Sequence, residues 1–310
     1  MNILWILAAV YAAATVGNMV FSLSIPVGAL VLVSVAFALI HGALRYRWSG
    51  IAAFIVICLV VSNVLENMSI LTGFPFGHYH YTGLLGQKLF LVPVLIGLAY
   101  FSTGYLAWAL STVLIGDVRS GSSAFTAFAV PFIGSFLMVM WDLGFDPTFS
   151  TIQHAWIWEQ GGGYFGVPLT NYLGWFFTVY VFFQLFALFL RVRPAGQDEK
   201  RTLPASYHGQ AVVMYAVLGL TFVLSYMVGT SDTLVTDAAG LVWHSRSIAE
   251  SEAIVSIYTM LFVAALATVK LVQAATGVRE TSVDAQTNGS AAAARKQSTE
   301  RSIPPATRRA

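Results

Sequence analysis

The sequence predicts an all-helical (all-α) integral membrane bundle with about eight transmembrane helices, seven being the alternative. Hydrophobic residues make up 57% of the 310 residues and charged residues only 10%, whereas soluble domains carry about 25% charged residues. The apolar residues fall into runs of about twenty, the length that spans a hydrocarbon core of about 30 Å. This composition and this spacing are typical of a polytopic membrane protein.

Eight candidate spans can be marked along the chain. They lie at 3–22, 26–44, 51–71, 89–115, 122–143, 169–190, 209–229 and 253–273. Pro26 and the short SLSIP link predict a tight hairpin of the first two spans, and Pro93 suits the beginning of the fourth. From Gly277 the chain turns to Ala, Ser, Thr, Gln, Pro and Arg, a composition that does not order itself. We therefore expect a transmembrane domain at 1–276 and a disordered cytoplasmic tail at 277–310.

The basic residues predict the orientation. With the N-terminus inside, fourteen of the sixteen Lys and Arg residues fall on one side and only Lys88 and Arg246 on the other. Because cytoplasmic segments carry the excess of Lys and Arg, we expect a multi-pass protein of the cell membrane with both termini cytoplasmic. The segments 72–88, 144–168 and 230–252 would then lie outside. A net charge of +2 gives no indication of a nucleic-acid partner.

Three polar residues share one face of the third span. Asn63, Glu66 and Asn67 stand at i, i+3 and i+4, a spacing that aligns them on a helix. Glu66 lies roughly 7 Å inside the outer end by the helical rise. An ionisable group at that depth is costly and indicates a functional site. A structural polar patch that joins two helices is the alternative.

The segment GFPFGHYHYTG at 73–83 alternates histidine and tyrosine. If it is extended, His78 and His80 lie on one face and Tyr79 and Tyr81 on the other. A metal site needs more ligands at workable spacing, and the chain holds only six histidines and one cysteine. We therefore predict no metal, and histidines that hydrogen-bond carboxylates or water.

The stretch from Trp141 to Trp175 holds three carboxylates and no Lys or Arg. If the fifth helix continues to Asp146, then Asp142 and Asp146 stack on one face, and two close carboxyls do not both ionise easily, so one holds a proton. The alternative is that Asp146-Pro147 ends the helix and starts a turn. Asp142 is the preferred acid because it lies deeper.

Aromatic and polar side chains near these carboxyls are candidate substrate contacts, with an interfacial aromatic belt as the alternative for the aromatic ones. The candidates are Asn63, Asn67, Phe76, His78, Tyr79, His80, Tyr81, Trp141, Trp156, Trp158, Tyr164, Asn171, Tyr172 and Trp175.

Three pieces of the sequence together resemble a membrane carotenoid-biosynthesis protein family. They are GFPFGHYHYT at 73–82, the Asp-Pro pair at 146–147, and the W-x-W at 156–158 followed by GGYFGVPLTNYLGW at 162–175. The resemblance covers about 50–275. The characterised members of this family are carotenoid 1,2-hydratases, including the hydratase of the bacterioruberin pathway (bisanhydrobacterioruberin hydratase).

The resemblance implies an all-helical membrane enzyme, a hydro-lyase that adds water across the terminal C1=C2 bond of an acyclic ψ end group and leaves a tertiary alcohol. It implies a lipophilic carotenoid substrate, water as the second reactant and membrane lipid as the surroundings. Other enzymes of the carotenoid pathway are candidate partners.

The residues suit this chemistry without a cofactor. A neutral carboxylic acid in an apolar site can donate a proton, and aromatic faces stabilise a cation. A second carboxylate or a histidine can orient the water. We therefore expect Asp142 to be the acid, with Glu66 and Asp146 as its catalytic partners.

Other functions remain as alternatives. A transporter or channel for a small ion or solute would use Glu66 and Asp142 as an ion path, but it predicts polar residues through the whole membrane thickness, whereas these are concentrated at the outer end. A retinal-type photoreceptor needs a lysine deep in a late span, and Lys88 and Lys270 lie near span ends. Prenyl transfer calls for Asp-rich motifs that bind magnesium diphosphate, and two aspartates are too few. Another carotenoid- or isoprenoid-modifying membrane enzyme stays open.

Overall fold

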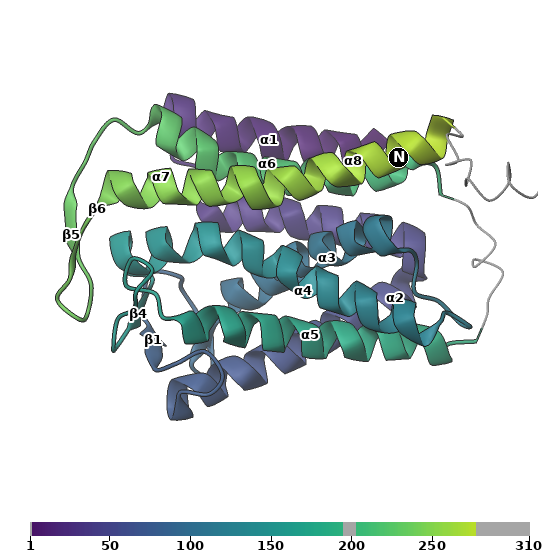
Figure 1. Ribbon diagram of the computed structural model, residues 1–310, viewed down its shortest axis with the longest axis horizontal. Helices are drawn as coiled ribbons and strands as arrows, with labels where there is room; N and C mark the ends of the chain where they lie inside the picture. Colours follow the sequence, from purple (N-terminus) through teal and green to yellow (C-terminus); the bar gives the residue numbers. More distant parts are fainter. Residues whose placement is uncertain (1, 195–202, 277–310) are drawn as a thin grey trace, which may run out of the picture. The chain divides into compact units, whose positions relative to one another are not determined.

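The structure is a computed structural model that describes residues 2–194 and 203–276. Within these residues, seven helical stretches are long and apolar enough to cross a membrane, and Figure 1 shows them packed side by side. The helices are α1 (Asn2–Phe21), α2 (Val27–Thr72), α3 (Val94–Ile115), α4 (Ala124–Asp146), α5 (Leu169–Val192), α6 (Ala205–Val228), α7 (Ser245–Ser256) and α8 (Phe262–Thr276), with the π-helical segments η1 (Pro147–Ile152) and η3 (Ile257–Leu261). The predicted class, an all-helical multi-pass membrane protein, is confirmed.

The chain divides into two units after Leu271. In the second unit only the end of α8, up to Thr276, is described. The tail predicted at 277–310 lies outside the described residues.

The 46-residue α2 is two helices that meet at Arg47, where φ is 59° and ψ is 171°. Tyr105 of α3 contacts both halves: its hydroxyl lies 2.6 Å from His41 Nδ1, and its ring packs on Phe54 with centroids 6.0 Å apart. In a straight helix, residues 41 and 54 would stand about 20 Å apart, so the chain folds back at Arg47. The halves supply the predicted second and third spans, and each of the eight predicted spans has a helical counterpart.

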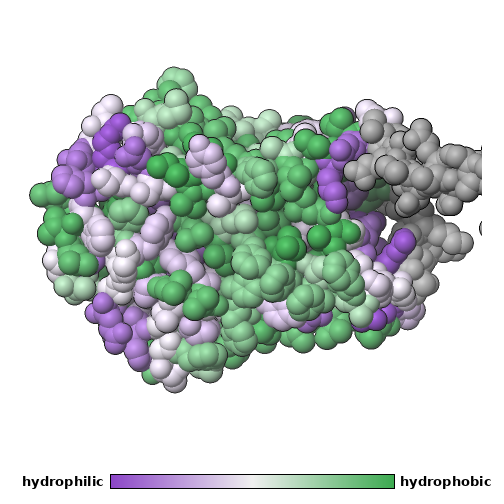
Figure 2. All heavy atoms as spheres, viewed as in Figure 1, coloured by the Kyte–Doolittle hydropathy of each residue, from purple (hydrophilic) through white to green (hydrophobic). Residues whose placement is uncertain are grey.

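The outer surface of the helices is apolar along their middle. Figure 2 shows a broad band of hydrophobic residues, with hydrophilic residues gathered toward both ends. Val56, Val60 and Val64 of α2 are each more than half exposed. A band of this kind is matched to the hydrocarbon core of a bilayer rather than to water.

Three short antiparallel strand pairs connect the helices in the described residues. They are β1 (Tyr79–Tyr81) with β4 (Trp156–Trp158), β2 (Lys88–Leu89) with β3 (Val92–Pro93), and β5 (Leu234–Thr236) with β6 (Val242–His244). In Figure 1, β1, β4, β5 and β6 all lie at the end of the helices where α7 begins. In the first pair, Tyr79 stands opposite Trp158 and Tyr81 opposite Trp156. β1 is extended, the condition under which histidine and tyrosine were expected on opposite faces, and both tyrosines are buried with His80 exposed between them.

Among the predicted helix starts, two differ most from the structure. The fourth transmembrane helix begins at Val94 rather than at 89, because the extended Pro93 pairs with Lys88 in the hairpin that precedes it. The last one begins at Ser245 rather than at 253. Its first twelve residues, α7, are too polar for a hydropathy pattern to reveal, although they form a helix that runs on through η3 into α8.

The fifth span does not end at the Asp146-Pro147 pair. α4 runs through Asp146 and continues as η1 to Ile152. Asp142 and Asp146 therefore share one helical face, and the alternative that Pro147 begins a turn is wrong.

Two contacts let the helix pass this proline. Pro147 has no N–H to donate to the Leu143 carbonyl, and the Tyr164 hydroxyl donates to that carbonyl at 3.2 Å. The next N–H, of Thr148, donates to Glu252 Oε1 of α7 at 2.9 Å, and the Thr148 hydroxyl donates to Oε2 at 2.9 Å. Side chains from outside α4 thus supply hydrogen bonds that a regular helix would make internally.

Candidate active site

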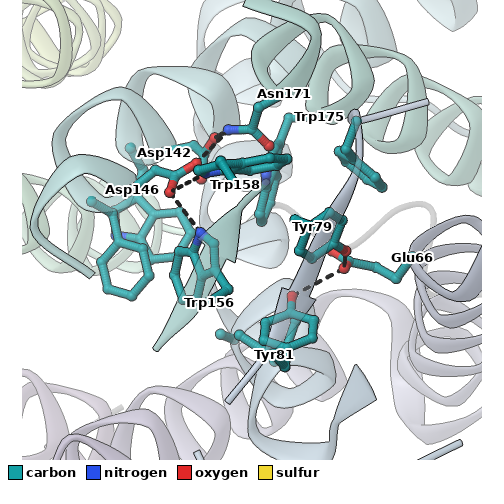
Figure 3. A pocket seen from close by; sticks show the side chains of 14 residues that line it. Glu66, Tyr79, Tyr81, Asp142, Asp146, Trp156, Trp158, Asn171 and Trp175 are labelled. Carbon is teal, nitrogen blue, oxygen red and sulfur yellow. Dashed lines mark hydrogen bonds between the residues drawn. The ribbon is translucent and has the colours of Figure 1, made fainter. Parts of the chain in front are cut away.

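Three buried carboxyl groups lie at the end of the helices where β1 and β4 pair. The second half of α2 supplies Glu66, and α4 supplies Asp142 and Asp146. Their side chains are at most 3% exposed. Figure 3 shows the aspartate pair on one side of a pocket and Glu66 on the other, with side chains of β1 and β4 between them.

Three tyrosine hydroxyls donate to Glu66. Tyr100 of α3 donates to Oε1 at 2.8 Å, Tyr81 donates to Oε2 at 3.0 Å, and Tyr79 also donates to Oε2. Because successive strand residues point to opposite faces, Tyr79 and Tyr81 reach the same carboxyl group from one strand. Donors of this kind replace water around a buried carboxylate.

The two strand tyrosines act as donors and not as acids. Burial is the main cause that raises the pKa of the Tyr79 and Tyr81 hydroxyls well above the usual value, and the neighbouring Glu66 charge raises each pKa further. Both groups therefore stay protonated at physiological pH, and both can hold Glu66 by hydrogen bonds over that range.

Asn171 at the start of α5 bridges the aspartate pair. Its Nδ2 donates to Asp142 Oδ2 at 3.0 Å and to Asp146 Oδ2 at 2.5 Å. The indole N–H groups of Trp156 and Trp158 donate to Asp146 Oδ1 at 2.7 and 3.3 Å. Asp146 thus accepts from three side chains, whereas these contacts give Asp142 one donor.

A cavity of about 30 Å³ lies between these groups, with room for about two water molecules. It is lined by Glu66, Phe76, Tyr79, Tyr81, Ile96, Ala99, Trp141, Asp142, Phe145, Asp146, Trp156, Trp158, Asn171 and Trp175. This lining, drawn from the described part of the chain, includes no Lys, Arg or His. The carboxyl groups are therefore held by neutral donors.

The other walls of the cavity are aromatic rings in close contact. Trp175 stacks on Tyr100 with centroids 4.3 Å apart, and Trp158 lies 4.7 Å from the Tyr79 ring. On the α4 side, Trp141 stacks on Phe145 at 4.4 Å. Such faces are negative at their centres and attract a positive charge.

The structure brings most of the predicted site residues into this one lining. Besides the three carboxyl groups, they are Phe76, Tyr79, Tyr81, Trp141, Trp156, Trp158, Asn171 and Trp175.

Six predicted residues lie outside the lining. They are Asn63, Asn67, His78, His80, Tyr164 and Tyr172. His78 and His80 are exposed on the face of the segment opposite the tyrosines, and His80 Nδ1 lies 3.4 Å from Glu159 Oε1. In residues 2–194 and 203–276, no group of three or more His, Cys, Asp and Glu side chains is arranged to hold a metal ion.

The remaining four make contacts outside the cavity lining, and Tyr172 packs edge-on against Tyr164. Asn67 donates to the Asn63 carbonyl at 2.7 Å and accepts from the Leu91 N–H at 3.0 Å. The Tyr164 hydroxyl donates to the Leu143 carbonyl, which lacks the usual helical donor because Pro147 has no N–H. The Tyr172 hydroxyl is buried and has no hydrogen-bond partner among the described residues.

Sequence reasoning missed Tyr100, Ile96 and Ala99 of α3 and Phe145 of α4. The residues of α3 from Tyr100 to Thr112 are all buried, so no amphipathic period shows which side faces the site. The available signal was Tyr100 itself, because a tyrosine hydroxyl buried in an apolar span usually has a hydrogen-bond partner.

The fold and the site together define a class: a multi-pass helical membrane protein with buried carboxyl groups in an aromatic cavity at one end of its helices. Residues 26–236 match the carotenoid biosynthesis protein family. Because the match covers more than half of the 310 residues, the chain belongs to that family, which implies an enzymatic role with a carotenoid substrate. Comparisons with curated proteins and with solved structures found no match.

Proposed function

We propose that this protein hydrates the terminal C1=C2 bond of an acyclic carotenoid end group by acid catalysis. The observation that carries the proposal is the placement of carboxyl groups on both sides of a water-sized aromatic cavity in a carotenoid biosynthesis protein. Adding water to a trisubstituted alkene needs a proton donor, a stabilised tertiary cation and a placed water molecule. The cavity offers a candidate for each.

Asp142 is the candidate proton donor. Hydrogen bonds to a carboxylate favour its ionised form, and Asp146 accepts three whereas Asn171 gives Asp142 one. When the pair shares one proton, that proton therefore resides on Asp142. Its transfer to C2 leaves a tertiary cation at C1.

Aromatic rings and Glu66 would act on that cation. The faces of Trp175 and Trp158 stabilise a positive charge next to them, and a carboxylate at Glu66 adds an opposite charge across the cavity. A water molecule that adds to C1 gives up a proton to the ionised aspartate pair, which restores the acid and leaves the tertiary alcohol. The net reaction joins one alkene and one water into one alcohol, so it needs no oxidant or reductant.

The first test is the product. In a host that makes an acyclic carotenoid, expression of this chain should convert the pigment to a derivative heavier by one water per reacted end, measured by chromatography and mass spectrometry. Purified protein should do the same with no added redox cofactor and after treatment with a strong chelator. Loss of activity on chelation that one metal restores would contradict the acid mechanism. A dehydrogenated or isomerised pigment would indicate another carotenoid-modifying reaction instead, and ion flux with unchanged pigment would indicate the transporter alternative.

We also propose that the site faces the outer side of the cell membrane, with both termini and the 277–310 tail in the cytoplasm. The support is the concentration of basic residues at the opposite end. There Arg45 pairs with Asp117, and Arg193 donates to the Tyr46 carbonyl at 2.9 Å. The cytoplasmic side of a membrane protein carries such residues.

Reporter fusions test this orientation. Reporters at either terminus should give a cytoplasmic signal, and one after Gly161 should give an outer signal, because Gly161 lies in the loop between β4 and α5 at the site end. A cytoplasmic signal from the Gly161 fusion would reverse the orientation and move the proposed site to the other face.

A further inference from the structure

A second hollow lies between the second half of α2 and α3. Its volume is about 110 Å³, and it is lined mainly by apolar side chains, among them Leu59, Val94, Gly97 and Leu98. Val94 is half exposed, and Val60 and Val64, which follow the lining residues Leu59 and Asn63 along α2, are exposed as well. The hollow, here called the α2–α3 groove, thus opens on the apolar band that faces lipid.

The groove meets the active-site cavity at two residues. Glu66 and Ile96 line both spaces, and Tyr100, which donates to Glu66, lines the groove. Glu66 is the only acidic or basic side chain in the groove lining, as far as the described residues show. A mainly apolar surface therefore leads from the exposed side of the groove to Glu66.

Two sequence features build the groove. Gly97 lets Leu59 of α2 approach α3 closely, since a Cβ at this position would stand only 3.0 Å from Leu59 Cδ2. At the polar end, the β2–β3 hairpin closes the groove with Leu89, Val92 and Pro93, and the Asn67 amide holds this hairpin by accepting the Leu91 N–H.

We propose that the α2–α3 groove binds the polyene chain of the acyclic carotenoid next to its reacting end group, and that Ile96 marks the passage into the cavity. This inference rests on the proposed function. The cavity has room for about two waters, so the conjugated chain has to lie outside it. The groove has the matching chemistry, opens on lipid and adjoins Glu66.

The test fills the groove without touching a carboxyl group. In Gly97→Phe the ring would displace the Leu59 side chain and fill the groove that both residues line. Leu59→Trp fills the same space from a half-buried position and serves if the first variant folds poorly. Gly209→Phe on α6 is the matched control, since a Cβ at Gly209 meets nothing within 4 Å.

Each variant is purified in lipid nanodiscs and assayed with two substrates: a long acyclic carotenoid and a ten-carbon alkene that carries the same end group. Carotenoid binding is measured in a separate experiment, as the amount of pigment that remains with the purified protein. Both groove variants should bind and convert the long substrate about tenfold less well, the effect of losing burial of about two methylene-sized groups. They should convert the short alkene as the unmodified protein does, and Gly209→Phe should match the unmodified protein on both.

Other outcomes distinguish a failure of the groove proposal from a failure of the proposed hydration reaction. If both groove variants bind and convert the long carotenoid normally, the groove does not bind the polyene chain. An equal loss of activity on both substrates would contradict the proposal as well. Loss of bound phospholipid with full carotenoid binding would make the groove a lipid site and overturn it too. If the unmodified protein hydrates neither substrate but binds the carotenoid in a way that Gly97→Phe weakens, the groove stands and the proposed reaction fails.

Discussion

Asp142→Asn should lower the rate of hydration by about 100-fold to 10,000-fold, the loss associated with removing a general acid. Asparagine keeps the shape of the side chain but has no carboxyl proton to transfer, and the variant should still insert and bind carotenoid. The measurement is the rate of product formation in membranes that contain equal amounts of protein. Asp232→Asn, which changes an exposed carboxylate of the β5 region, is the control and should leave the rate unchanged.

The companion variant Asp146→Asn distinguishes the two aspartates. It should reduce stability more than Asp142→Asn, because Asn171 and two indole N–H groups lose a charged acceptor. If Asp146→Asn abolishes hydration while Asp142→Asn retains it, the acid is Asp146. If both variants and Glu66→Gln stay active, the carboxylate mechanism is wrong.

Glu66→Gln should lower the rate by about 100-fold, the scale of losing one group that stabilises transition-state charge. The amide carries no charge, and its NH₂ group would face a tyrosine hydroxyl that now donates to Glu66. One buried O–H without an acceptor costs about 1–3 kcal/mol, so the thermal unfolding temperature should fall as well.

The control for this variant is Glu159→Gln. Glu159 is half exposed and lies beside His80, away from the cavity lining, so both rate and unfolding temperature should stay unchanged. Tyr100→Phe gives a graded comparison, because it removes one of three donors and should slow the reaction less. Hydration at a normal rate by Glu66→Gln would make Glu66 a structural residue.

Local periodicity predicted much of the site. The i, i+4 spacing of Asp142 and Asp146 and the alternation of Tyr79 with His80 each fix a side-chain direction once the segment is helical or extended. The apolar runs likewise predict the spans, since a membrane crossing requires a minimum length of apolar residues.

Contacts between distant segments were not predictable in this way. The pairing of β1 with β4 brings Trp156 and Trp158 to Asp146, and nothing in either short strand specifies the other. Tyr100 reaches Glu66 from a helix without an amphipathic period. The polar α7 also escaped a hydropathy pattern, although its Glu252 is buried and holds Thr148.

The contact at Pro147 couples the loop between β4 and α5 to the aspartate pair. The Leu143 carbonyl depends on the Tyr164 hydroxyl, and Leu143 and Asp146 lie within one turn of the same helix. Lifting the loop would leave that carbonyl without this donor, at a cost of about 1–3 kcal/mol, just where Asp142 and Asp146 are positioned. Opening this loop to solvent therefore costs free energy at the turn of α4 that keeps the two aspartates aligned. The proposed path along the α2–α3 groove would leave this contact closed, so the end group could reach the cavity while Asp142 and Asp146 stay in place.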